Sequence, residues 1–84
     1  MEIKLYQRVA LTQDLPQHRL RRGDVAVVVE QLPANPATQG EVGYVLEVFN
    51  AVGETIDVIL VPASIVKPLS EDEILQARSL TSTR

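Results

Sequence analysis

The chain has 84 residues, no cysteine and a formal net charge of −3, with 45% hydrophobic and 23% charged residues. These values describe one small globular domain, and they exclude a disordered chain, a disulfide framework, a thiolate metal site and a cysteine nucleophile. No apolar run approaches the roughly 20 residues of a membrane helix, and the first residues lack a secretory signal, so we expect a cytoplasmic protein without membrane association.

Two strands are predicted in the first part of the chain. Residues 8–11 form a short strand because apolar residues alternate on one face. Residues 12–23 form a long polar loop, which we expect Leu15 and Leu20 to pin to the core. Residues 25–32 are rich in β-branched side chains, which favour a pleated surface, so they predict a central strand.

The middle of the chain predicts a hairpin. Residues 32–40 contain two prolines, an asparagine and a glycine, and these indicate a loop. Residues 43–49 and 55–61 are expected to pair as antiparallel strands, with Phe49 in the core. A last short strand is predicted over residues 65–69.

A helix is predicted after this last strand. Ser70 and Glu73 have the spacing of a capping box, in which each side chain satisfies an amide of the first helical turn. The helix is expected to run to Leu80, before a frayed tail over residues 81–84. Its apolar stripe comprises Ile74, Ala77 and Leu80.

The order of these elements predicts a mainly β fold. We expect a small SH3-like barrel of about five antiparallel strands over residues 1–69, followed by a short C-terminal α-helix and tail over residues 70–84. Sequential antiparallel strands of such a barrel close on themselves and leave little open edge.

Two segments carry a resemblance to a known family. Residues 9–16 read V-A-L-T-Q-D-L-P and residues 20–30 read L-R-R-G-D-V-A-V-V-V-E. This pattern resembles that of a family of small bacterial proteins with no assigned activity, V-x-L-T-x-D-L-P followed by L-x-x-G-D-x-x-x-V-V. Residues 44–55 and 61–68 are similar to its closing segments. The resemblance implies an SH3-like fold, and for some members a role as antitoxin-like partners of neighbouring proteins.

The candidate binding site is the basic loop, which comprises His18, Arg19, Arg21 and Arg22. Arginine forks match carboxylates and phosphates, and long loops on a rigid scaffold commonly carry recognition. The alternative is a solvated loop whose arginines pair with surplus acids, because residues 24–84 hold nine acids against three basic residues. His18 is the sole histidine, so we predict no metal site.

No catalytic arrangement is predicted. The predicted hairpin contains three acids, Glu47, Glu54 and Asp57. Their spacing is that of the solvated face of a hairpin, and it does not indicate a catalytic carboxylate pair. Ser64 and Ser70 have no histidine and acid to activate them. The cell-adhesion tripeptide over residues 22–24 is explained by a glycine-aspartate turn. We therefore expect no enzyme and no cofactor.

Three functions remain open at this point. The first is a non-enzymatic protein-interaction module that binds a protein partner or a second copy through the basic loop, a barrel edge or the C-terminal helix. The second is a nucleic-acid-binding module, because residues 20–29 resemble the KOW-type element of ribosomal and transcription SH3-like domains; Arg19, Arg21 and Arg22 would contact phosphates. The negative net charge disfavours this reading. The third is a subunit that completes an enzyme.

Overall fold

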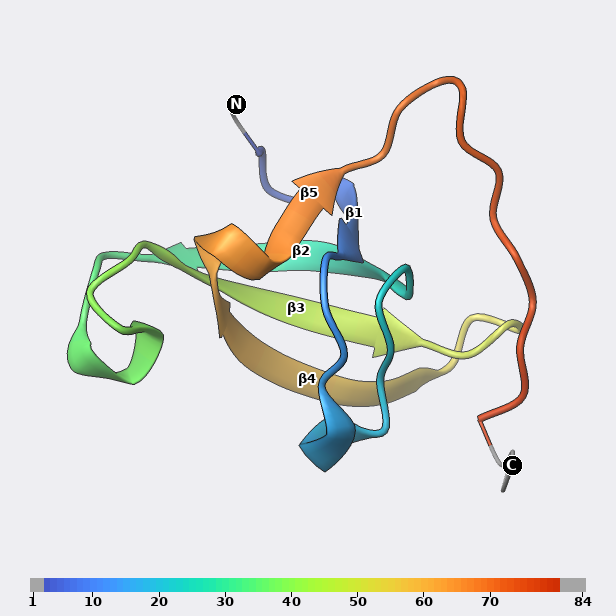
Figure 1. Cartoon of the computed structure of the whole chain (residues 1–84), viewed down its shortest axis with the longest axis horizontal. Coiled ribbons are helices and arrows are strands. Elements are labelled where there is room, and N and C mark those ends of the chain that lie inside the picture. The colour runs from blue at the N-terminus through green and yellow to red at the C-terminus, as the bar shows by residue number, and fades with distance from the viewer. Residues whose placement is uncertain (1–2, 81–84) are drawn as a thin grey trace.

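The computed structural model describes residues 3–80, and within this range five strands form one antiparallel sheet in the order β4-β3-β2-β1-β5 (Figure 1). The predicted mainly β class is confirmed. The strands are β1 (Arg8–Leu11), β2 (Val25–Leu32), β3 (Gly43–Phe49), β4 (Thr55–Pro62) and β5 (Val66–Pro68). The 3₁₀ turns are η1 (Pro16–His18), η2 (Pro36–Thr38) and η3 (Ala63–Ile65).

One face of the sheet carries the hydrophobic core. In β3, Leu46 and Val48 are buried, whereas Glu47 between them is half-buried, because successive side chains of a strand point to opposite faces. Leu15 and Leu20 are also buried, and they pair with each other as an isolated bridge. The prediction that these two leucines anchor the long loop to the core is confirmed.

The sheet is not closed into a barrel, so the predicted barrel closure is wrong. Within residues 3–80, β4 pairs with β3 and β5 pairs with β1, and the two edge strands do not pair with each other. β5 has three residues and ends at Pro68, which has no N–H to donate to a further ladder. The short last strand therefore leaves β4 as an open edge.

The predicted C-terminal helix is also wrong. Residues 69–80, named here the strap, run away from β5 and return toward the turn between β3 and β4 (Figure 1). The Ser70 amide does donate to Glu73 Oε1 at 2.8 Å, but the turn does not propagate. A helix of this length is marginal without a surface to pack against, and Ile74 of its expected apolar stripe is 92% exposed. The expected tail over residues 81–84 lies outside the described residues.

The loop before β3 is fixed by a buried threonine. The Thr38 hydroxyl lies within hydrogen-bond distance of two backbone carbonyls, 2.6 Å from that of Glu41 and 3.0 Å from that of Asn35. Gly43 begins β3 directly beside it, and a Cβ atom at this position would lie 2.7 Å from Thr38 Cγ2. The start of β3 therefore requires glycine for reasons of space.

Candidate functional site

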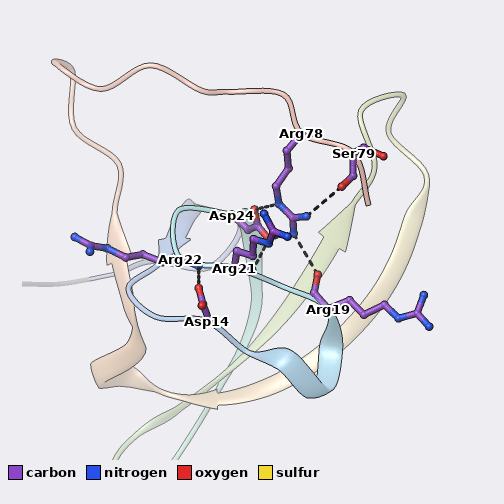
Figure 2. Close-up of polar contacts among 7 residues, drawn as sticks. All are labelled: Asp14, Arg19, Arg21, Arg22, Asp24, Arg78 and Ser79. Carbon is purple, nitrogen blue, oxygen red and sulfur yellow. Dashed lines mark hydrogen bonds and ion pairs between the residues drawn. The ribbon is translucent and has the colours of Figure 1, made fainter. Parts of the chain in front are cut away.

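The four residues of the basic loop do not converge on one point. The side chains of Arg19 and Arg22 point in opposite directions (Figure 2). The Arg22 backbone amide donates to Asp14 Oδ1 at 2.9 Å. His18 lies on the side of β4, with its Nδ1 atom 3.4 Å from Asp57 Oδ2. A single phosphate-sized ligand would not meet all four side chains in this arrangement, and their role in binding stays a prediction.

Arg78 of the strap forms an ion pair with Asp24, which directly precedes β2, and we name this pair the latch (Figure 2). Arg78 Nε donates to Asp24 Oδ1 at 2.8 Å, and Nη2 donates to Asp24 Oδ2. Nη2 also donates to the backbone carbonyl of Arg19, at 3.2 Å. The latch therefore ties the strap to both ends of the basic loop.

The latch changes the acidity of Asp24. Burial raises the pKa of this carboxyl group, but the hydrogen bonds from Arg78 and from the Arg21 amide, with the positive charges of both arginines, outweigh burial. The net pKa of Asp24 is therefore below its ordinary value. Sequence reasoning missed the latch because it placed Arg78 on a helix. The available signal was that Arg78 is the sole basic residue of an otherwise acidic strap.

An open cavity of about 1140 Å³ lies between the strap and the sheet. Strap residues Ile74, Leu75 and Leu80 line one side, and Val25 and Phe49 are among the sheet residues that line the other. These strap side chains face the sheet across open space and stay exposed, with Ile74 at 92%.

The largest exposed apolar feature of the sheet lies on β4. Ile56, Val58 and Leu60 are 41%, 57% and 40% exposed, and they occupy every second position on the outward face of the strand. We name these three residues the outer β4 stripe. Ile59 and Val61 alternate with them and are buried. Sequence reasoning missed the stripe, although a run that is apolar on both faces was visible in residues 58–61.

Phe49 lies at the end of β3 and is 37% exposed, so its predicted position in the core is wrong. It follows Val48, which faces the core, and the alternation of the strand turns the ring outward. Thr55 is its cross-strand partner on β4, and Ile56 follows Thr55. Phe49 therefore extends the apolar outward surface from β4 onto β3.

The carboxylates of the hairpin serve local hydrogen bonds. Glu47 accepts from the Thr55 hydroxyl, and Glu54 accepts from Asn50 Nδ2 at 2.8 Å. Among residues 3–80, no group of three or more histidine, aspartate or glutamate side chains gathers as a metal site. No helix in the described part of the chain has the length and hydrophobicity to cross a bilayer.

The sequence comparison reaches from just before β1 to the end of β5. A family model described as "Domain of unknown function (DUF4926)" matches residues 5–68. The match includes all five strands and stops before the strap. It confirms the predicted resemblance to a family without an assigned function. Comparisons with curated proteins and with solved structures returned no match.

Proposed function

We propose that this chain, which belongs to the DUF4926 family, is a non-enzymatic protein-interaction module. The observation that carries the proposal is the outer β4 stripe with Phe49 beside it, because contiguous large apolar side chains exposed on a small protein mark interaction surfaces. A partner that covers this surface would bury side chains that water now surrounds.

The open edge of β4 supports the same proposal. As a further part of the proposal, we relate the fold to SH3-like barrels. The sheet order β5-β1-β2-β3-β4 is the order of sequential antiparallel strands around such a barrel, with the sheet left open between β4 and β5. The partner would be a neighbouring protein in the cytoplasm, to which this chain contributes a small, antitoxin-like subunit.

The proposal is tested by affinity purification from a lysate of the source organism with two matched variants. The stripe variant carries Ile56→Thr, Val58→Thr and Leu60→Thr, and threonine is a β-branched residue that suits a strand. We expect it to lose the protein that the wild-type chain captures, whereas the control variant Arg21→Ala with Arg22→Ala should retain it. Circular dichroism establishes that both variants fold.

Two results would contradict the proposal. The first is equal capture by the wild-type chain and the stripe variant. The second is binding of an oligonucleotide that weakens steeply with salt and is lost in the Arg21→Ala, Arg22→Ala variant, because phosphate contacts release counterions. That second result would establish the nucleic-acid-binding alternative instead.

A further inference from the structure

We infer that β4 is a docking edge for an extended peptide segment in which apolar residues alternate with lysine or arginine. The inference rests on the proposed function and names the chemistry of the partner. The two edges of the sheet differ: β5 has three residues and ends in proline, whereas β4 has eight residues and reaches proline only at Pro62. An unblocked edge strand is a template for a further strand, so β4 is the edge that accepts one.

The backbone of β4 presents the groups that such pairing needs. The Ala63 amide donates to the Val42 carbonyl at 2.9 Å. In an antiparallel pair every second residue of a strand bonds to its neighbour, so this bond shows which residues of β4 face β3. Following that alternation, Ile59 and Val61 bond to β3, whereas the N–H and C=O groups of Val58 and Leu60 face away. The Val58 amide agrees with this, because it donates to the side chain of Asp57 at 2.9 Å. A guest strand would therefore pair with Val58 and Leu60.

The side chains of the edge define the apolar half of the guest. Val58 and Leu60 are 57% and 40% exposed, and by the alternation above their backbone N–H and C=O groups point away from β3. A guest strand continues the pleat, so every second guest side chain lies beside the outer β4 stripe. Those guest residues are apolar, because cross-strand contact with isoleucine, valine and leucine then buries apolar surface on both strands.

The charges around the edge define the other half of the guest. Residues 41–65 contain four acids and no lysine or arginine. Asp57 is the acid within β4, where its Oδ1 accepts from the Val58 amide and its Oδ2 lies 3.4 Å from His18 Nδ1. A guest strand takes over the Val58 amide and frees this carboxylate, which a guest lysine or arginine then pairs with. A second copy of β4 would bring acids against acids, so charge favours a basic partner over self-association.

The test measures the binding of labelled peptides, each as long as β4, to the full chain. We expect a peptide of alternating lysine and valine to bind, measured by fluorescence anisotropy, at least about tenfold tighter than alternating lysine and proline. The second peptide carries equal charge but places proline, which has no N–H, at the apolar positions that would pair with Val58 and Leu60. It should also bind tighter than alternating glutamate and valine. Equal binding of the lysine-valine and lysine-proline peptides would overturn the inference.

Two variants at one position isolate the backbone contribution. Val58→Pro removes an N–H that does not serve the β3–β4 ladder, and proline is tolerated at such edge positions. We expect it to lose lysine-valine peptide binding, while Val58→Thr, which keeps the N–H, retains most of it. If Val58→Pro folds and still binds the peptide, edge pairing is wrong. A wild-type dimer that Val58→Pro abolishes would assign the edge to a second copy and overturn the basic partner.

The outcomes separate the two proposals. If the stripe variant loses its cellular partner but Val58→Pro retains it, the chain is an interaction module that uses side chains without strand addition. If both lose it, the partner adds a strand to β4.

Discussion

Removal of the latch is the sharpest test of how the strap is held. Arg78→Gln deletes the guanidinium charge and leaves a side chain that still donates a hydrogen bond. The side chains of Arg78 and Asp24 are only 26% and 19% exposed, so solvent screens the pair partly. Paired hydrogen bonds to a charged group in such a setting contribute about 1–2 kcal/mol, between the values for exposed and buried pairs. The ratio of closed to open strap should then fall by a factor of about 5–30.

The assay is the backbone heteronuclear nuclear Overhauser effect of residues 74–80 by solution NMR. We expect these amides to have values near those of the sheet in the wild-type chain and to shift toward those of a mobile chain in Arg78→Gln, with the sheet amides unchanged. The matched control is Lys67→Gln, which breaks the other ion pair of the strap, Lys67–Glu73. Its partners are 43% and 33% exposed, so its effect should be much smaller.

Two results would refute this reasoning. Unchanged strap amides in Arg78→Gln would show that the latch does not hold the strap. If Lys67→Gln mobilised the strap amides as much as Arg78→Gln does, the degree of burial of an ion pair would not determine how strongly that pair holds the strap.

Three further predictions concern pH and the core. Because the pKa of Asp24 is lowered by folding, the latch is complete above the ordinary aspartate pKa and is lost as the pH falls through the lowered value. Acid should therefore mobilise the strap of the wild-type chain in the same NMR measurement. In Arg78→Gln acid should cause only the much smaller change expected from loss of the Lys67–Glu73 pair. Leu46→Ala, at a fully buried position, should lower the free energy of unfolding by about 2–5 kcal/mol in urea denaturation, and a loss below 1 kcal/mol would contradict the assigned core. Gly43→Ala should cost about 1–3 kcal/mol by the same assay, because the added Cβ meets the buried Thr38, and unchanged stability would show that the loop yields.

The strands could be predicted from sequence because local chemistry specifies them. The β-branched run of β2 and the Gly23-Asp24 turn before it depend on neighbours in the chain. The burial of Leu15 and Leu20 was also visible, since isolated apolar residues in a polar loop have few other places to go.

The open sheet and the extended strap could not be predicted, because each depends on contacts distant in sequence. Ser70 and Glu73 make a local contact of the expected capping type, yet the strap is also held by Arg78 against Asp24, which lies 54 residues earlier. Local capping and apolar spacing describe a helix that would form if its apolar face could pack against another part of the protein. They carry no information on whether that surface exists.

The outer β4 stripe illustrates a different limit. Residues 58–61 alternate the exposed Val58 and Leu60 with the buried Ile59 and Val61. A strand that is apolar on both faces normally lies at the centre of a structure. Only the sheet order shows that this strand lies at an edge. A sequence typical of a central strand therefore occupies an edge position. This conflict supports the proposed interaction surface, and it becomes visible only when both the sequence and the sheet order are known.

The strap and the docking edge should act independently. Ile56 and Phe49 line the cavity beneath the strap, but Val58 and Leu60, whose backbone groups face outward, are not part of its lining. Ile56 is the one member of the outer β4 stripe that the two sites share, so changes at them should be nearly additive, and Arg78→Gln should alter the affinity of the lysine-valine peptide by no more than about twofold. A change of tenfold or more, measured by the same fluorescence anisotropy, would show that the strap controls access to β4. The strap lies outside residues 5–68 and the edge lies within them, so independence would place recognition in the part of the chain that the family shares.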